Sequence, residues 1–169
     1  MSESALGQSM QTAITLRPAL PEEVDFLLSL YASTREAELQ MFGWSAAQLD
    51  AFIRMQFNAQ TQHYVNGYPD AENKIVCLGD TRIGRLLVDR SRAEILLVDI
   101  ALLPEFRGAG VGGRLIQELL DEADRQGKAV KLHVVKTNPA GRLYQRLGFS
   151  VTQDDGVYFE MVRPVSGTS

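Results

Sequence analysis

The N-terminal part of the chain contains one short β-favouring run, and a segment with the hydrophobic spacing of a helix follows it. Residues 14–17 form the β-favouring run, and Pro21 stands at a position where a helix can begin. The apolar residues that follow recur every three or four positions and so share one helix face: Val24, Leu27, Leu28 and Tyr31. This pattern predicts a strand and then an amphipathic helix.

A second helix has a specific start signal. Ser45 and Gln48 have the spacing of a capping box, in which each side chain binds the backbone N–H of the other residue. Trp44 and Leu49 occupy the two positions of a hydrophobic staple, a contact that fixes how the chain enters the helix. One apolar stripe continues from there along the predicted helix: Leu49, Phe52, Ile53 and Phe57.

Three β-rich segments follow, at residues 74–78, 82–88 and 94–103. Gly79-Asp80 and the charged residues 89–92 separate them and are typical of turns. Short turns between successive strands predict an antiparallel meander.

Beyond the meander, helical and strand patterns alternate. Residues 107–126 have helical spacing and end before Gly127, a residue type that commonly terminates helices. A strand is expected at residues 129–135, and a short helix at residues 139–147 that ends at Gly148. The last two strands are expected at residues 149–152 and 157–162.

The predicted order is β-α-α-β-β-β-α-β-α-β-β. Such an order indicates an α+β fold, an α/β sandwich in which helices flank a mixed, largely antiparallel central sheet. We expect a single domain over residues 14–165, with flexible ends at residues 1–13 and 166–169 because both ends are small and polar.

Composition and charge exclude several classes of protein. The chain has 169 residues, 45% of them apolar, and a net charge of -4, which argues against nucleic-acid binding and against a basic membrane-binding surface. Cys77 is the only cysteine, and the histidines are His63 and His133, so the sequence lacks the spacings of zinc sites. We therefore expect a cytoplasmic protein without a metal.

The glycine-rich segment 107–113, Arg-Gly-Ala-Gly-Val-Gly-Gly, is the first candidate for ligand binding. It follows a predicted strand and opens a predicted helix, where backbone N–H groups without helical partners favour an anion. Gly108, Gly110 and Gly113 also match the dinucleotide-binding pattern, but only about sixty residues follow, too few for that fold. A phosphate loop of the Gly-Lys-Ser/Thr type is absent. Close packing of a helix on the sheet remains an equal explanation of the glycines alone.

Two segments together resemble the GNAT N-acetyltransferase superfamily. Residues 104–112 resemble its acyl-CoA pyrophosphate loop, Gln/Arg-x-x-Gly-x-Gly/Ala, and residues 138–149 resemble its Asn…Leu-Tyr…Gly-Phe stretch. The positions that match these two patterns are Arg107, Gly110 and Gly112, and Asn138, Leu143, Tyr144, Gly148 and Phe149. The similarity is specific over about residues 95–162, whereas the earlier part agrees in element order only.

The resemblance implies acetyl-CoA as the acyl donor. The backbone of the glycine loop would hold its pyrophosphate, and the strand that ends near Leu102 would diverge from its neighbour and pair with pantetheine. An N–H near Leu102 would polarise the thioester carbonyl. The cofactor-binding residues expected on this basis are Leu102, Arg107, Gly108, Ala109, Gly110, Val111, Gly112, Gly113 and Asn138.

The resemblance also assigns the catalytic acid. Tyr144 would protonate the leaving thiolate, because an ordinary phenol pKa of about 10 is roughly matched to that of a thiol. The helical stripe that contains Tyr144 is equally typical of a core tyrosine. Asn138, similarly, has the position of a helix cap as well as that of a CoA ligand.

The catalytic base departs from the family pattern. Many relatives carry a glutamate on the strand before the glycine loop, whereas residues 95–98 of this chain are wholly apolar. Asp99 lies one residue beyond the expected position, and one step along a strand turns a side chain to the opposite face unless a bulge intervenes. Asp99 and a chain of waters are therefore alternative routes for the proton.

The acceptor implied by the family is a primary amine, either of a small molecule or of a protein, that attacks the thioester directly in a ternary complex. Residues 36–44 and 63–70 are expected to provide the acceptor side. Because family members are often dimers, a homodimer is a further expectation. A non-catalytic acyl-CoA-binding module on the same fold is the alternative function, and a nucleotide-dependent oxidoreductase is a third.

Overall fold

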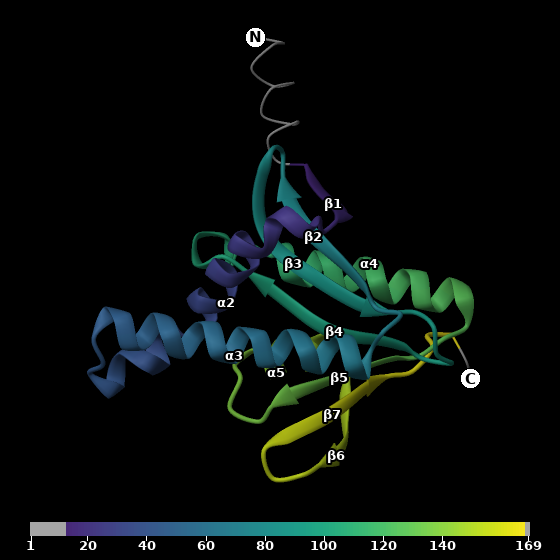
Figure 1. Ribbon diagram of the computed structural model, residues 1–169. Coiled ribbons are helices and arrows are strands. Elements are labelled where there is room, and N and C mark those ends of the chain that lie inside the picture. The colour runs from purple at the N-terminus through teal and green to yellow at the C-terminus, as the bar shows by residue number, and fades with distance from the viewer. Residues whose placement is uncertain (1–12, 168–169) are drawn as a thin grey trace. The chain divides into compact units, whose positions relative to one another are not determined.

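The computed structural model describes residues 13–167, and its elements alternate as the sequence pattern predicts. The order is β-α-α-β-β-β-α-β-α-β-β, with short 3-10 turns before α2, after α2 and after β4 (Figure 1). The bounds are β1 Ile14–Pro18, α2 Val24–Leu39, α3 Ala46–Gly67, β2 Glu72–Leu78, β3 Thr81–Asp89, β4 Ile95–Leu102, α4 Val111–Gln126, β5 Val130–Val135, α5 Ala140–Arg146, β6 Ser150–Asp154 and β7 Tyr158–Arg163.

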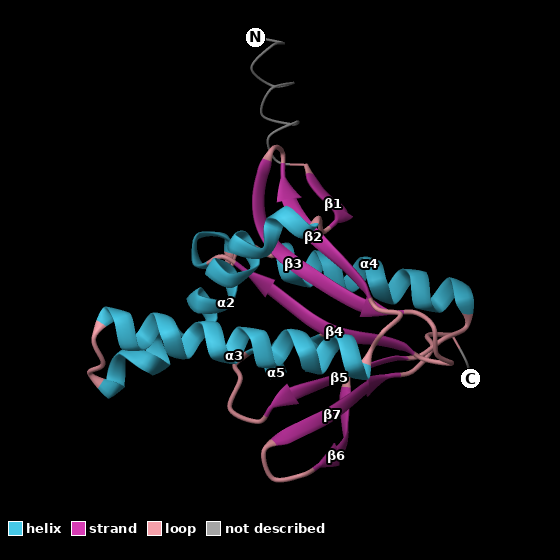
Figure 2. Cartoon of the chain, in the orientation of Figure 1, coloured by secondary structure: helices cyan, strands magenta, loops and turns pink. Residues whose placement is uncertain are grey.

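The strands form one seven-stranded sheet with the hydrogen-bonded order β1-β2-β3-β4-β5-β7-β6 (Figure 2). β1 and β2 are antiparallel, as are β5 and β7 and the pair β6 and β7, whereas β4 and β5 are parallel. The predicted α+β class with a mixed, largely antiparallel sheet is therefore confirmed.

The chain divides into two compact units. The first unit contains the described residues up to Pro69, together with Asn73–Leu86 and Ala101–Arg107. The second contains Asp70–Glu72, Leu87–Ile100 and the described residues from Gly108 onward. The strands β3 and β4 each contribute residues to both units.

The first unit is built on helices that pack against the start of the sheet. Leu27 of α2 and Phe57 of α3 form one apolar cluster with Ile75 and Cys77, which share a face of β2 because they are two residues apart. The capping box at the start of α3 is formed as predicted: the Gln48 backbone N–H donates to the Ser45 hydroxyl at 3.2 Å. The Ser45 N–H donates to the Gln48 side chain at 3.0 Å.

The second unit is organised around α4, whose apolar positions are buried at helical spacing. These positions are Leu115, Ile116, Leu119, Leu120 and Ala123. Its strands also have fully buried positions, among them Ile95, Val130, Leu132 and Met161.

Three expectations about local structure need correction or fall outside the structure. The helix expected from residue 107 begins at Val111, because Gly108 and Gly110 have positive φ angles of 77° and 83°, which an α-helix does not allow. Val24, expected on the buried face of its helix, is 52% exposed because it lies in the first turn of α2. The predicted flexible ends lie largely outside the described residues.

Candidate functional site

The glycine loop of the second unit leads directly into α4. Gly110 is the residue before the first turn, and no side chain caps the helix there. The first residues of an α-helix have backbone N–H groups without helical partners, and the first turn of α4 contains no acidic side chain to repel an anion. The loop and the start of α4 therefore gather backbone N–H groups that lie at the positive end of a helix with no acidic side chain in its first turn.

The sequence left two explanations of the loop glycines open, binding of a ligand by the backbone and close packing of a helix on the sheet, and the structure tests the second. An ideal Cβ built on Gly108 or on Gly110 meets no heavy atom within 4 Å, so neither glycine is required by close packing. Their positive φ angles require glycine, since this conformation is rare for other residues. Gly113 differs, because a Cβ there would lie 3.6 Å from the Leu143 side chain of α5. The start of α4 therefore lies beside the helix that carries Tyr144.

Tyr144 lies in α5 and is 7% exposed. Its ring makes an edge contact with Phe149, with the ring centroids 5.8 Å apart, and this contact restricts its orientation. Burial, with a further contribution from the charge of Asp99, raises the pKa of Tyr144 to about 12. The ordinary pKa assumed from the sequence is therefore too low, and the phenol is fully protonated at neutral pH.

Asp99 is half-buried on β4, close enough to Tyr144 for its charge to act on the phenol. The parallel pairing of β4 with β5 comprises Ile95↔Val130 to Leu97↔Leu132 and so ends two residues before Asp99. Both strands continue beyond that point, β4 to Leu102 and β5 to Val135. Two of the sequence-predicted residues, Asp99 and Tyr144, are therefore brought together in the second unit.

Asn138 lies two residues before the first residue of α5 and binds two backbone N–H groups at the start of that helix. Its side-chain oxygen accepts a hydrogen bond from the Ala140 N–H at 2.9 Å, and its backbone oxygen accepts one from the Gly141 N–H at 3.1 Å. The residue immediately before α5 is Pro139, so Asn138 lies one position earlier than the cap expected from the sequence, although its side chain does bind the first backbone N–H of α5. The side-chain amide of Asn138 is exposed and still offers N–H donors to a ligand.

Arg107 and Leu102 belong to the first unit, where they bind each other. The Arg107 Nε–H donates to the Leu102 carbonyl oxygen at 2.9 Å, and its guanidinium also donates to the Ser33 hydroxyl of α2 at 3.3 Å. The Arg107 backbone N–H donates to Pro104 at 3.3 Å, and the Leu103 N–H donates to Ile83 at 2.8 Å. The side chain of Arg107 therefore links the end of β4, at Leu102, to Ser33 of α2.

Two residues of the first unit were not recognised from the sequence. A Cβ on Gly84 of β3 would lie 2.3 Å from the Ala101 carbonyl oxygen and 2.7 Å from the Leu102 side chain, so the backbones approach closely where β4 ends. Arg85, the next residue, is buried. The sequence feature that could have identified Arg85 is that it is the one charged residue within the otherwise uncharged run 83–88.

The acidic residues near the expected acceptor side are on the surface. Glu38 pairs with Arg35 at 3.1 Å, and Asp50 pairs with Arg54 at 2.9 Å.

Among the described residues there is no cluster of three or more metal-binding side chains, and no described helix is long and apolar enough to cross a membrane.

The family model that matches this chain and the solved structures named with it are all of acetyltransferases. Residues 68–151 match the family model described as the acetyltransferase (GNAT) domain. Solved structures with the same fold include the PaiA N-acetyltransferase of Thermoplasma acidophilum in complex with coenzyme A, at 20% identity and a TM-score of 0.68, covering 90% of this chain and 99% of that one.

Two further structures have similar scores. An acetyltransferase of Thermus thermophilus has 20% identity and a TM-score of 0.66, with 91% of this chain and 98% of that chain covered. The ribosomal-protein-S18-alanine N-acetyltransferase of Escherichia coli has 20% identity and a TM-score of 0.60, with coverages of 93% and 97%. At these identities the likeness establishes the fold.

Proposed function

Because the chain belongs to the GNAT acetyltransferase superfamily, we propose that it is an N-acetyltransferase that moves the acetyl group of acetyl-CoA to a primary amine. The observation that carries this proposal is the pair formed by Asp99 and the buried Tyr144, in the same unit as the glycine loop. Acetyl transfer needs a proton acceptor and a proton donor, roles that Asp99 and Tyr144 would fill, whereas binding alone needs neither.

The glycine loop would hold the donor through its main chain. The N–H groups of residues 108–113 and the positive end of the α4 dipole would bind the pyrophosphate. The open space at Gly108 and Gly110 supports this assignment, because a ligand can approach the backbone there. Asn138 would bind the CoA arm through its exposed amide.

The transfer would proceed in a ternary complex. The amine must lose a proton before it attacks, since an alkyl ammonium with a pKa of about 10.4 has no free lone pair at neutral pH. Asp99 would accept this proton. The amine nitrogen then attacks the thioester carbonyl carbon, and the carbon–sulfur bond breaks as the amide forms.

Asp99 and Tyr144 would act in sequence because they are electrostatically coupled. While Asp99 is charged, it contributes to the high pKa of Tyr144. When Asp99 takes the proton of the ammonium, that contribution disappears and Tyr144 becomes a stronger acid as the thiolate leaves. Tyr144 donates its proton to the sulfur. The second proton of the attacking nitrogen, lost as the amide forms, restores the Tyr144 phenol, and the proton on Asp99 passes to solvent.

The test is release of CoA that depends on an amine. Purified protein is incubated with acetyl-CoA, a panel of primary amines and a thiol reagent, and binding of acetyl-CoA is measured separately by calorimetry. The proposal expects acetyl-CoA binding, CoA release with some amines and the matching acetylated product by mass spectrometry. Binding and thermal stabilisation without release from any amine would favour the acyl-CoA-binding module instead.

A further inference from the structure

Helix α3 of the first unit carries few charges for a helix at a protein surface. The segment 39–69, which contains α3, has only two charged residues, Asp50 and Arg54, whereas charged residues make up 22% of the whole chain. These two residues form an ion pair with each other at 2.9 Å. Because the solvent side of a surface helix normally carries charged residues, exposure to water alone does not account for the composition of α3.

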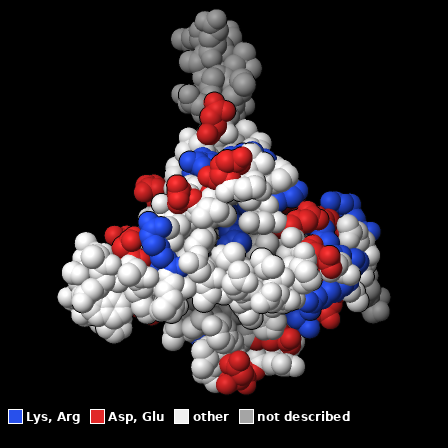
Figure 3. All heavy atoms as spheres, in the orientation of Figure 1, with Lys and Arg blue, Asp and Glu red and all other residues white. Residues whose placement is uncertain are grey.

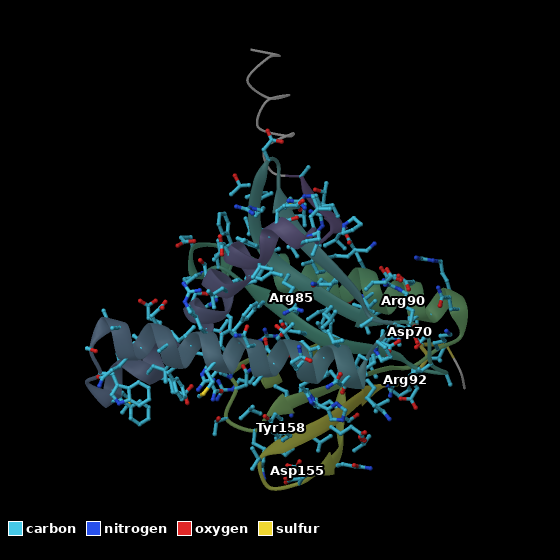
Figure 4. The ribbon with its side chains drawn as sticks, in the orientation of Figure 1. Asp70, Arg85, Arg90, Arg92, Asp155 and Tyr158 are labelled. Carbon is cyan, nitrogen blue, oxygen red and sulfur yellow. The ribbon has the colours of Figure 1, made fainter. Side chains whose placement is uncertain are left out.

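One side of α3 already packs within the first unit. Ile53 and Phe57 are buried there, and Phe57 belongs to the apolar cluster that includes Leu27 of α2. Further along the helix, the guanidinium carbon of Arg85 lies 5.4 Å from the centre of the Tyr64 ring, and Figure 4 labels Arg85 beside α3. Any surface of α3 that is open to a partner therefore lies on the opposite side.

The opposite side of α3 is exposed along the length of the helix. Its residues alternate spacings of three and four, which aligns them in one seam along the helix. None of them is charged, and Met55 and Val65 are 57% and 58% exposed. The space-filling view shows mostly uncharged atoms along α3 (Figure 3). The residues of this outer face are Gln48, Ala51, Met55, Asn58, Gln62 and Val65.

An exposed aromatic cluster continues the outer face at the start of α3. Met41 is 86% exposed, Phe42 60% and Trp44 39%. The rings of Phe42 and Trp44 stack with their centroids 5.2 Å apart, so they form one continuous apolar surface. With Met55, these side chains expose roughly 500 Å², at about 200 Å² for each full side chain. Exposed apolar patches of this size commonly mark interaction sites.

We propose that the outer face of α3 packs against the same face of a second copy of the chain, with the two helices antiparallel about a two-fold axis beside residue 53. Ala51 of each copy then lies opposite Met55 of the other, so a small side chain meets a large one twice. Gln48 lies opposite Asn58, and their amides can hydrogen-bond to each other. A two-fold interface needs a surface that complements itself, and this spacing provides one.

The two charges of α3 also fit this arrangement. Asp50 and Arg54 lie along one edge of the outer face and are 63% and 58% exposed. An antiparallel two-fold keeps that edge on the same side of both helices, so Asp50 of each copy comes near Arg54 of the other. Opposite charges that meet in this way favour the correct orientation of the two copies.

The composition of α3 favours a protein over a lipid surface as the partner. A helix that lies on a membrane has Lys and Arg residues on its polar side, whereas Arg54 is the only Lys or Arg of α3 and is paired with Asp50. A stable protein interface buries about 800 Å² on each partner. The exposed apolar patch supplies more than half of that area, and the polar residues of the outer face supply the remainder.

The first experiment measures association of the full chain. Sedimentation velocity over a dilution series, from high micromolar to nanomolar protein, should show a dimer that dissociates to a monomer. Trp44 is the only tryptophan of the chain and lies opposite Gln62 in the proposed dimer, so its emission should shift to shorter wavelength as the dimer forms. A wild type that is monomeric at the highest concentration would overturn the proposal, as would a dimer whose Trp44 emission equals that of the monomer.

Two single substitutions test the contact between the helices. Ala51→Lys and Met55→Glu each place an unpaired charge in the proposed interface and should weaken the dimer by about a hundredfold or more. Both residues are exposed, so the monomer should remain folded, which circular dichroism checks. Val157→Glu is the control, because Val157 is 58% exposed but lies in the second unit, and this variant should dimerise like the wild type.

An equal mixture of Ala51→Lys and Met55→Glu distinguishes the proposed contact from a general loss of stability. In a mixed dimer, the lysine introduced at position 51 faces the glutamate introduced at position 55, and the other contact is the native one. The mixture should therefore recover dimers that neither variant forms alone. Dimers that persist in both folded variants, or a mixture that stays monomeric, would contradict antiparallel packing through α3. No acetyl-CoA or amine is needed, so the result is independent of the proposed function.

Discussion

At the scale of single residues, burial determines what Tyr144 can do. A phenol with a pKa of about 12 remains protonated throughout the range in which proteins are normally assayed. It is therefore always available as a donor, but it transfers its proton less readily than a tyrosine in water. Loss of the Asp99 charge would remove the smaller of the two causes of this high pKa, so that the phenol would transfer its proton more readily.

Replacement of Tyr144 by Phe tests this assignment. The ring and its contact with Phe149 remain, but the hydroxyl is lost, so kcat should fall by about a hundredfold, the typical contribution of a general acid. The KM for acetyl-CoA should change little. Tyr158→Phe is the matched control, because Tyr158 lies in the same unit and is 47% exposed. Unchanged single-turnover rates in Tyr144→Phe would make Tyr144 a core residue only.

Gly84 illustrates a residue whose constraint comes from a neighbouring backbone. Gly84→Ala would place a methyl group 2.3 Å from the Ala101 carbonyl oxygen, so β3 and the end of β4 would have to shift. We expect a loss of about 2 kcal/mol or more in unfolding free energy, measured by urea denaturation. Gly67→Ala is the control, because a Cβ there meets nothing within 4 Å. Equal stability of the two variants would contradict the close approach.

At the scale of elements, α4 has the same type of residue at both ends. Gly110 precedes its first turn with φ 83°, and Gly127 follows its last turn with φ 66°. A Cβ on either glycine meets nothing within 4 Å. A residue other than glycine would therefore be strained to a similar degree at either end. Only the N-terminal end has backbone N–H groups without helical partners.

This symmetry provides a controlled test of the glycine loop. Gly110→Ala and Gly127→Ala should each cost about 1 kcal/mol of stability, because alanine is disfavoured at positive φ. Only Gly110→Ala should also weaken acetyl-CoA binding, by about tenfold, since strain there would displace the amides that we propose bind the pyrophosphate. Thermal unfolding and calorimetry measure the two effects. Equal acetyl-CoA affinity in both variants would exclude a binding role for the loop conformation.

The order of elements could be predicted from the sequence because hydrophobic spacing and turn residues are local signals. Ser45 and Gln48 mark the start of α3 correctly, and Gly127 marks the end of α4. The start of α4 was placed too early, since helical spacing cannot distinguish a helical turn from a loop with positive φ angles. The pairing of Asp99 with Tyr144 depends on where two distant segments meet, which spacing does not encode.

At the scale of the whole molecule, carboxyl groups in both units make folding sensitive to acid. Hydrogen bonds from partners in the folded state lower the pKa of Glu23, Asp124, Asp154, Asp155 and Glu160. The unfolded chain then binds more protons than the folded chain in acid. The contribution of these carboxyl groups to the free energy of unfolding is therefore fully present above their ordinary pKa. It decreases as the pH falls through their lowered pKa values in the folded state.

Glu23 is suited to a test of this dependence because its side chain is 5% exposed. Its carboxylate accepts hydrogen bonds from both terminal nitrogens of Arg17 and from the Leu20 N–H, and Arg82 lies 3.8 Å away. The Arg17 hydrogen bonds are the main cause of the lowered pKa of Glu23. Glu23→Gln removes the charge that these groups stabilise.

At pH 7, Glu23→Gln should lose about 1 to 2 kcal/mol of unfolding free energy, a range typical of hydrogen bonds to a charged group. Glu38→Gln, whose side chain is 64% exposed and pairs with Arg35, should lose less than about 0.5 kcal/mol. The difference between wild type and Glu23→Gln should narrow as the pH falls toward 3, because the wild-type carboxyl is then protonated as well. Thermal unfolding at pH 7, 5 and 3 measures it, and a difference that stays constant would mean that packing rather than charge accounts for the loss.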